Sequence, residues 1–196
     1  MDCEKVEKSD IQAAKDGAGK LLADVKKHLN EKYQFDANLV GSATRGMIIK
    51  DSNGMYDLDY QIILEGVSQD NAQSIHYDFS NAFKSAITKN QHAYNKVEDS
   101  TSAITVKCSN HSLDFVILRK KTNHTEIVRR SDQNKYSWNI LSSKHDDVYK
   151  KFNQLSDKEK EELAERVIKR KCKAKMRGAG ELSYVIFVEE VNKYVP

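Results

Sequence analysis

The spacing of apolar residues along the chain predicts alternating helices and strands. In four segments apolar side chains recur every three or four positions, as on one face of a helix. Other segments are short and rich in β-branched and aromatic residues, as is typical of strands. The predicted helices are residues 9–31, the segment after Asp70, 156–176 and 182–194. The predicted strands are residues 35–40, 55–64, 102–108, 112–118 and 126–129.

Helix starts and turns support this division. Ser9 with Gln12, and Ser156 with Glu159, have the spacing of capping boxes, in which side chains bond the free N–H groups of a first helical turn. The three residues 109–111 between two predicted strands match the length of a hairpin turn. We therefore expect Ser9 and Ser156 to begin helices, and strands 102–108 and 112–118 to pair with each other.

The order of these elements predicts an α+β fold. A mixed sheet with helices on one face would form a core over residues 1–135, and a short helical part over 136–196 would pack beside it to form a cleft. We expect these two parts to make one compact unit.

Composition narrows the class of protein. The 196 residues are 39% apolar and 31% charged with a net charge of +3, which excludes a collagen, a coiled rod and a strongly charged disordered chain. The longest apolar run, Tyr184–Val188, is too short to span a membrane. The first ten residues lack the apolar region of a secretory signal, so we expect a cytoplasmic protein without membrane partners. Its cysteines, Cys3, Cys108 and Cys172, are then expected to be free thiols.

Positive charge is concentrated near the end of one predicted helix. Residues 169–177 contain six basic side chains in nine positions, after an acidic stretch at 157–165. An acidic first turn and a basic last turn are favoured by the helix dipole alone, so spacing favours a solvated face. The alternative is a cationic face that binds phosphate.

The residues with the clearest chemical potential lie between positions 41 and 114. Gly41-Ser42 follows a predicted strand, where glycine allows the backbone to approach a ligand and serine adds a hydroxyl. Asp57 and Asp59 are two positions apart on a strand, so both carboxylates face one side. Asp114 lies inside an apolar strand, where an acid is costly unless a partner compensates it. Each signal is weak alone, but together they indicate metal-assisted phosphoryl transfer with two Mg²⁺ ions between the acids.

At these residues the sequence resembles the nucleotidyltransferase superfamily of the DNA polymerase β type. The family pattern is Gly-Ser, a spacer, Asp-x-Asp and a distant third acid. Here fourteen residues separate Ser42 from Asp57, a somewhat long spacer, and Asp114 is the third acid. The segment GMIIK at 46–50 is similar to oligoadenylate synthases, and SWNILSSKH at 137–145 is similar to a segment of bacterial CD-NTases, without its proline.

The C-terminal segments resemble cyclic GMP-AMP synthases, CD-NTases and archaeal CCA-adding enzymes. These families have a basic helix followed by a Ser-Tyr helix, and 166–175 followed by 182–190 is similar. The resemblance implies that Ser183 and either Lys169 or Lys173 contact the triphosphate, and that Tyr184 stacks on the donor base. Relatives in this branch usually have a larger helical second half.

The resemblance implies an enzyme that moves NMP from an NTP (ATP, GTP or both) to a hydroxyl and releases pyrophosphate. Asp57, Asp59 and Asp114 are its expected catalytic and metal-binding residues, with Mg²⁺ or Mn²⁺ as cofactor, and Gly41 and Ser42 are expected to hold phosphates. The acceptor is expected to be a second nucleotide, which would give a nucleotide second messenger. The alternatives are an RNA 3′ end, a protein or antibiotic hydroxyl, or an inactive relative that only binds a nucleotide or nucleic acid.

Overall fold

The computed structural model describes residues 3–30, 32–67, 71–89, 93–131, 133–142, 146–176 and 182–195. The chain forms two compact units that interleave in sequence, whereas we expected two consecutive segments. The sheet unit contains Glu7–Gly41 and Asp57–Leu141. The helical unit contains Met1–Val6, Ser42–Tyr56 and Ser142–Pro196.

The sheet unit is built on a mixed seven-stranded sheet with the order β1-β2-β5-β4-β3, and β6 and β7 continue from β5. The strands are β1 Phe35–Val40, β2 Tyr56–Leu64, β3 Lys96–Asp99, β4 Ile104–Lys107, β5 His111–Lys120, β6 Thr125–Arg130 and β7 Tyr136–Ile140. As predicted, β4 and β5 form an antiparallel hairpin, closed by the Cys108 N–H that donates to the His111 carbonyl at 2.8 Å.

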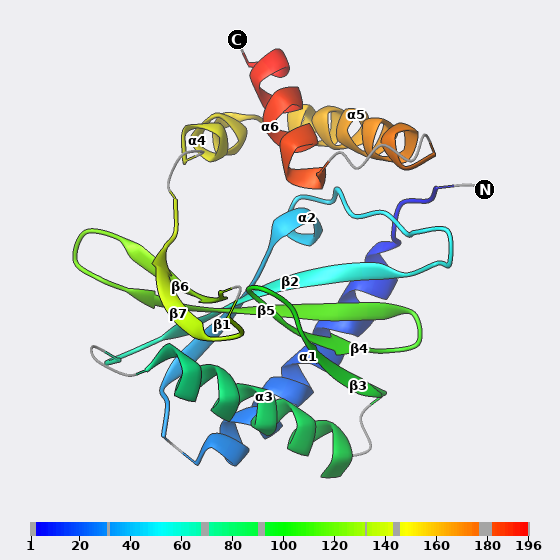
Figure 1. Cartoon of the computed structure of the whole chain (residues 1–196). Helices are drawn as coiled ribbons and strands as arrows, with labels where there is room; N and C mark the ends of the chain where they lie inside the picture. Colours follow the sequence, from blue (N-terminus) through cyan, green and yellow to red (C-terminus); the bar gives the residue numbers. More distant parts are fainter. Residues whose placement is uncertain are drawn as a thin grey trace. The chain divides into compact units, whose positions relative to one another are not determined.

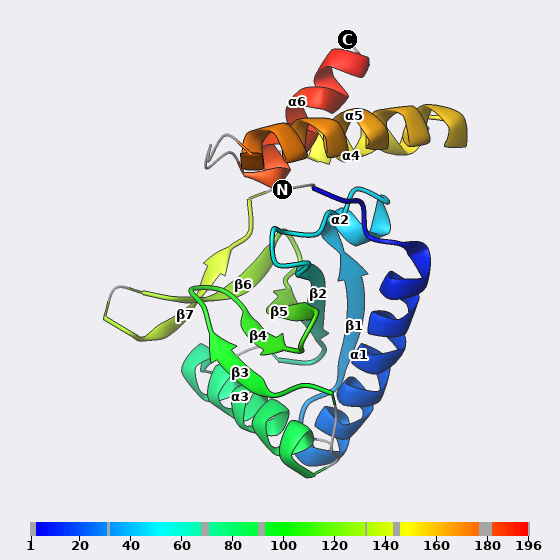
Figure 2. The same ribbon diagram turned by 90° about the vertical axis from the view of Figure 1, so that its right-hand side faces the viewer.

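Two long helices, α1 (Lys8–Leu29) and α3 (Ala72–Lys89), lie along one face of this sheet (Figures 1 and 2). Aromatic rings join α3 to the strands. The Phe79 ring lies 5.2 Å from that of Phe35 on β1, and the Phe83 ring lies 4.5 Å from that of Phe115 on β5. The predicted α+β architecture, with helices on one face of a mixed sheet, is therefore confirmed, while the cleft stays a prediction.

The helical unit has a separate apolar core. Its helices are α4 Asp146–Gln154, α5 Asp157–Met176 and α6 Ser183–Tyr194, and the short α2 (Gly41–Thr44) leads into it. Its core consists of Met47, Val148, Phe152, Leu163, Ala164, Val167, Ala174, Ile186, Phe187 and Val191. The predicted cap of α5 is confirmed, because the Ser156 N–H donates to the Glu159 carboxylate at 2.8 Å and the Glu159 N–H to the Ser156 hydroxyl at 3.4 Å.

Some local predictions were wrong. Helix α1 begins at Lys8 with Glu7 before it, so Ser9 lies inside the helix and does not cap it. The short β3, β7 and α4 were missed, because β3 is mostly polar, β7 has no buried side chain, and α4 buries only two, Val148 and Phe152. Asp70 lies outside the described residues, and Asn71 accepts the N–H of Gln73 at 2.8 Å. Within the described part of the chain, no helix has the length and apolar character needed to cross a membrane.

The prediction for the cysteines was wrong for two of the three. We expected three free thiols, but Cys3 and Cys172 form a disulfide with their Cα atoms 5.4 Å apart, and Cys108 is free and buried. The two partners are separated by 169 positions, so no local spacing signalled the pair. The fold brings them together by pairing the N-terminal segment with residues 48–50: the Val6 N–H donates to the Ile48 carbonyl at 3.2 Å.

Candidate active site

Two of the predicted acids project from the same face of β2. Burial alternates along this strand: Tyr56, Leu58 and Tyr60 are buried, whereas Asp57 is exposed and Asp59 is partly buried. Side chains two positions apart on a strand share a face, so the apolar residues pack inward and both carboxylates lie on the opposite face.

The third acid lies on the same face of the neighbouring strand. Asp114 is half-buried on β5, and Phe115 next to it faces α3. Asp114 therefore points away from the helices that cover the sheet. Ser112, two residues earlier and on the same face, donates a hydrogen bond to Asp57 Oδ1. The faces of β2 and β5 that carry the three aspartates therefore coincide.

The carboxylates of Asp57 and Asp114 interact electrostatically. Burial is the main cause that raises the pKa of Asp114, and the negative charge of Asp57 raises this pKa further. A hydrogen bond from Thr105 Oγ1, 2.5 Å from Asp114 Oδ1, acts in the opposite direction. Like charges placed this way repel each other, and a cation between them would relieve the repulsion.

Gly41 lies directly against the carboxylate of Asp59. Val40 pairs with Asp59 across β1 and β2, and Gly41 follows with φ of +74°. A Cβ atom at Gly41 would lie 3.1 Å from Asp59 Cγ and closer still to Oδ2. Glycine is therefore required both by the left-handed backbone and by the contact with Asp59.

The donor chemistry of these residues fits Mg²⁺. Carboxylate oxygens are the hard ligands that this ion prefers, and the three aspartates share one sheet face. Among the described residues, however, no three or more His, Cys, Asp or Glu side chains are grouped closely enough to hold a metal ion. Asp57 and Asp114 are instead bonded by Ser112 and Thr105.

A buried lysine contacts the serine of the Gly-Ser pair. Within the helical unit, Lys171 on α5 is 5% exposed, and its Nζ donates to Ser42 Oγ and to the Met47 carbonyl, each at 2.9 Å. An ammonium group removed from water is costly, so its burial beside a hydroxyl indicates a built polar site. Sequence reasoning did not name this residue.

The two lysines that it did name, Lys169 and Lys173, are both exposed on α5. Lys171 occupies the apolar stripe of this helix, four positions after Val167 and eight after Leu163. A lysine at a core position of an amphipathic helix is the sequence signal that could have identified it.

The aromatic residue predicted to contact a base belongs to a small cluster in the helical unit. The ring of Tyr184, on α6, lies 6.5 Å from that of Tyr149, which lies 5.8 Å from Phe187. The Arg45 guanidinium lies 4.4 Å from the Phe187 ring centroid. Burial, the first of several causes, raises the pKa of Tyr184 to about 12. Ser183 is exposed at the first residue of α6.

The segment 137–145 is described only in part. Trp138 lies on β7 beneath the Arg119 guanidinium, which is 4.2 Å from its ring centroid. Lys144 and His145 lie outside the described residues.

Comparison with known proteins supports the fold. No protein-family model and no curated protein matches the sequence. The chain is similar to the STING-associated CdnE c-di-GMP synthase from Capnocytophaga granulosa (TM-score 0.68, 15% identity, 97% of this chain and 63% of that one). It is also similar to CdnC of Escherichia coli MS115-1 with ATP (TM-score 0.61, 17% identity, 98% and 63%). A third similar structure is DncV of Vibrio cholerae with GTP (TM-score 0.63, 12% identity, 97% and 55%).

This chain therefore spans between 55% and 63% of the length of these three solved structures. Identities of 12–17% show likeness of fold and not of activity. The mixed sheet with three aspartates on the face opposite α1 and α3, together with these similarities, shows that the chain has the nucleotidyltransferase fold of the bacterial CD-NTases.

Proposed function

We propose that this protein is a metal-dependent nucleotidyltransferase that moves a nucleoside monophosphate from an NTP to a hydroxyl group and releases pyrophosphate. The observation that carries the proposal is the placement of Asp57, Asp59 and Asp114 on one face of two neighbouring strands. A fold without this chemistry gains nothing from three carboxylates that repel each other there.

The three aspartates have distinct roles in this proposal. Asp57 and Asp59 would hold Mg²⁺, or Mn²⁺ in its place, through their carboxylate oxygens on the face of β2 opposite α1 and α3. When bound, the metal neutralises the charge on the phosphates and makes the acceptor hydroxyl more acidic. Asp114 also contributes a metal ligand, and it accepts the proton of the acceptor hydroxyl, since a half-buried carboxylate is a stronger base than an exposed one.

Lys171, Ser42 and Gly41 bind the triphosphate. The ammonium of Lys171 is already held against the Ser42 hydroxyl, so both groups can donate to the same phosphate oxygens with little rearrangement. Gly41 lacks a side chain and lets its backbone N–H approach. In this assignment Lys171 replaces Lys169 and Lys173, whose exposed side chains would first have to be ordered.

Tyr184 is proposed to stack on the base of the donor nucleotide, with Ser183 at the triphosphate. Aromatic stacking contributes about 1–3 kcal/mol per base and tolerates any base. ATP and GTP are the donors to test first, because similar structures contain them.

A second nucleotide is the proposed acceptor, so that the product is a nucleotide signal. The similarity to a c-di-GMP synthase and to other CD-NTases supports this choice.

The test is incubation of the protein with each α-³²P-labelled NTP and with a mixture of the four, in Mg²⁺ or Mn²⁺. Separate reactions add an RNA with a free 3′ hydroxyl. Products are resolved by chromatography and identified by mass spectrometry. Asp57→Ala is the variant expected to be inactive. Asp36→Ala is its matched control, since Asp36 is also an exposed aspartate on a strand but lies at the end of β1 away from Gly41.

We expect a labelled nucleotide product with the wild type and Asp36→Ala, and none with Asp57→Ala. Label appearing only in added RNA would replace the signal product with 3′-end addition. No turnover of any NTP under all conditions would contradict the enzyme and leave a nucleotide-binding protein.

A further inference from the structure

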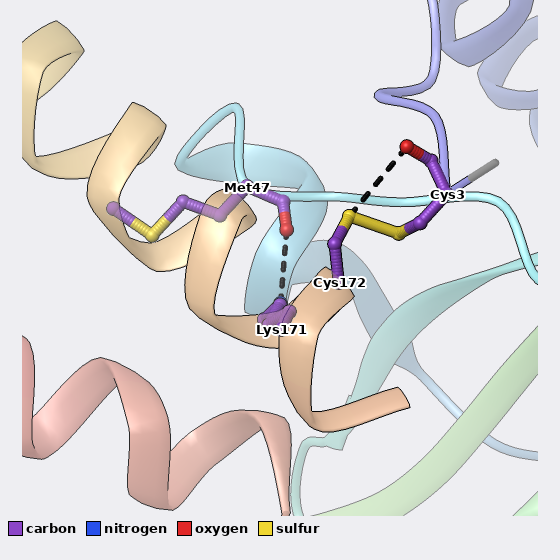
Figure 3. The surroundings of a disulfide bond; sticks show 4 residues. All are labelled: Cys3, Met47, Lys171 and Cys172. Atoms are coloured by element: carbon purple, nitrogen blue, oxygen red, sulfur yellow. Dashed lines mark hydrogen bonds between the residues drawn. A yellow bond between two sulfur atoms is a disulfide. The ribbon is translucent and has the colours of Figure 1, made fainter. Parts of the chain in front are cut away.

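The disulfide lies next to the proposed triphosphate site. Cys172 follows Lys171 directly on α5, and it joins Cys3 of the N-terminal segment (Figure 3). Both cysteines are partly exposed, so small reagents can reach the bond. Lys171, Met47, Cys3 and Cys172 all belong to the helical unit.

The N-terminal segment also holds the loop that contacts Lys171. The Lys50 N–H donates to the Glu4 carbonyl at 2.8 Å, and the Val6 N–H donates to the Ile48 carbonyl at 3.2 Å. Lys5 and Ile49 form an antiparallel bridge between these contacts. Residues 4–6 therefore pair with 48–50 as a short two-stranded ladder.

Together these contacts connect α5, residues 47–50 and the N-terminal segment in a closed ring. Lys171 Nζ bonds the carbonyl of Met47 at 2.9 Å, the next residues pair with the N-terminal segment, and that segment returns to α5 through Cys3 and Cys172 (Figure 3). Apart from the backbone, the disulfide is the only covalent link among these contacts. When it opens, the short ladder alone holds residues 3–6 against the loop, and so short a pairing is weak in water.

We propose that reversible oxidation of Cys3 and Cys172 regulates triphosphate binding by Lys171 and Ser42. The inference rests on the proposed function and adds a redox control to the same site. The oxidised form holds Lys171 and residues 42–50, which are the end of α2 and the loop that follows it, in fixed positions and binds triphosphate tightly. The reduced form loosens the loop and binds weakly, because part of the binding free energy then orders it.

The redox step is a thiol–disulfide exchange with a small-molecule disulfide such as oxidised glutathione. One cysteine thiolate attacks the small disulfide, which gives a mixed disulfide and releases one small thiolate. The second cysteine thiolate attacks the protein sulfur of the mixed disulfide and releases the other. Two electrons pass from the cysteines to the small disulfide, and each cysteine thiol loses one proton.

The experiment compares the full chain in oxidised and reduced glutathione, with the thiol state verified by mass. Affinity for inorganic tripolyphosphate and for ATP is measured by calorimetry, and amide hydrogen exchange is followed at Val6 and Lys50. Reduction is expected to weaken binding at least about fivefold, within the range of allosteric couplings. It should also speed exchange of both amides, which donate the hydrogen bonds of the ladder.

Three variants separate the effect of this bond from general reduction. Cys3→Ser and Cys172→Ser should each match the reduced wild type in both buffers. Cys108→Ser removes the free, buried cysteine and should respond to reduction as the wild type does.

Equal affinity of the two redox forms for tripolyphosphate would overturn the inference. If neither form binds tripolyphosphate or ATP, the proposed function fails, and hydrogen exchange then decides the inference separately. Faster exchange at Val6 and Lys50 after reduction would still support redox control of the loop, and unchanged exchange would refute it.

Discussion

The Nζ of Lys171 lies 2.9 Å from the Oγ of Ser42, although 129 positions separate the two residues in the sequence. Helix α5 thus supplies a cation, and α2 a hydroxyl, to one point in the helical unit. This contact is the reason for assigning the phosphate-binding role to Lys171.

Replacing Lys171 with methionine tests that assignment. The side chain keeps its length but loses the charge, so we expect affinity for tripolyphosphate to fall at least about tenfold, as for the loss of a hydrogen bond to a charged group. Calorimetry measures the affinity. Lys169→Met and Lys173→Met are matched controls on the exposed surface of α5 and should change it less than about twofold. A larger loss from either control than from Lys171→Met would assign the contact to that lysine.

Gly41→Ala tests the close approach to Asp59. Its positive φ costs an alanine about 1–2 kcal/mol, and the new Cβ would also collide with the Asp59 carboxylate. Gly54→Ala is the control, because Gly54 has a φ of +76° but open space at its Cβ position. Urea unfolding should show a clearly larger loss for Gly41→Ala, and nucleotide transfer should be lost only in this variant. Equal losses of stability would show that Asp59 moves aside freely.

Asp114→Asn should increase stability while it abolishes nucleotide transfer. The uncharged amide no longer requires burial of a charge beside Asp57, and it can still accept the hydrogen bond from Thr105. We expect the free energy of unfolding at pH 7 to rise by about 0.5–1 kcal/mol. A variant that is less stable than the wild type would indicate that the negative charge has a structural partner.

Tyr184 is tested by separating its ring from its hydroxyl. Tyr184→Phe should keep affinity for ATP within about twofold, whereas Tyr184→Ala should lower it about tenfold, as expected for loss of one stacked base. Binding of tripolyphosphate, which has no base, should be the same in both variants. Equal weakening of tripolyphosphate and ATP by Tyr184→Ala would mean that the ring supports α6 and does not contact a base.

The lowered pKa of His76 predicts how the free energy of unfolding depends on pH. Burial is the main cause that lowers the pKa of His76, despite the nearby Asp99, and its ring stacks on Tyr136 with centroids 3.6 Å apart. The folded state therefore prefers the neutral ring. As pH falls below the unfolded-state value near 6.5, the unfolded chain binds the proton first, and the free energy of unfolding decreases by at most about 1.4 kcal/mol per pH unit.

Urea unfolding at pH 7 and pH 5.5 checks this prediction. His76→Phe retains a ring for the stack and should reduce the pH dependence. The same pH dependence in His76→Phe as in the wild type would assign the effect to other groups, such as buried His111, whose pKa burial also lowers.

The sequence predicts that Asp57 and Asp59 share a face, but it does not predict that Lys171 contacts Ser42. The two-residue period of strands puts Asp57 and Asp59 on one face whatever the rest of the fold does. For Asp114 the same period excludes the face of Phe115, but only the pairing of β2 with β5 brings it to Asp57. The core position of Lys171 on α5 is visible in the sequence, but its contacts with Ser42 and Met47 depend on the folded chain and no local pattern encodes them.

The remaining errors have the same origin. Cys3 and Cys172 meet only because residues 4–6 pair with 48–50, a long-range contact of a few residues. β3 was missed because a four-residue edge strand with two exposed positions lacks a clear apolar alternation. Ser9 has the sequence of a cap, but α1 starts one residue earlier.

Interleaving of the two units has a consequence for biosynthesis. Translation delivers the chain from its N-terminus, and the last strand of the sheet unit ends at Ile140, before α5 has been made. A nascent chain halted after this strand already carries Asp57, Asp59, Asp114 and the Gly-Ser pair, but it lacks Lys171 and Cys172. In the proposed assignment, triphosphate binding is therefore acquired late in synthesis, only after α5 has been made.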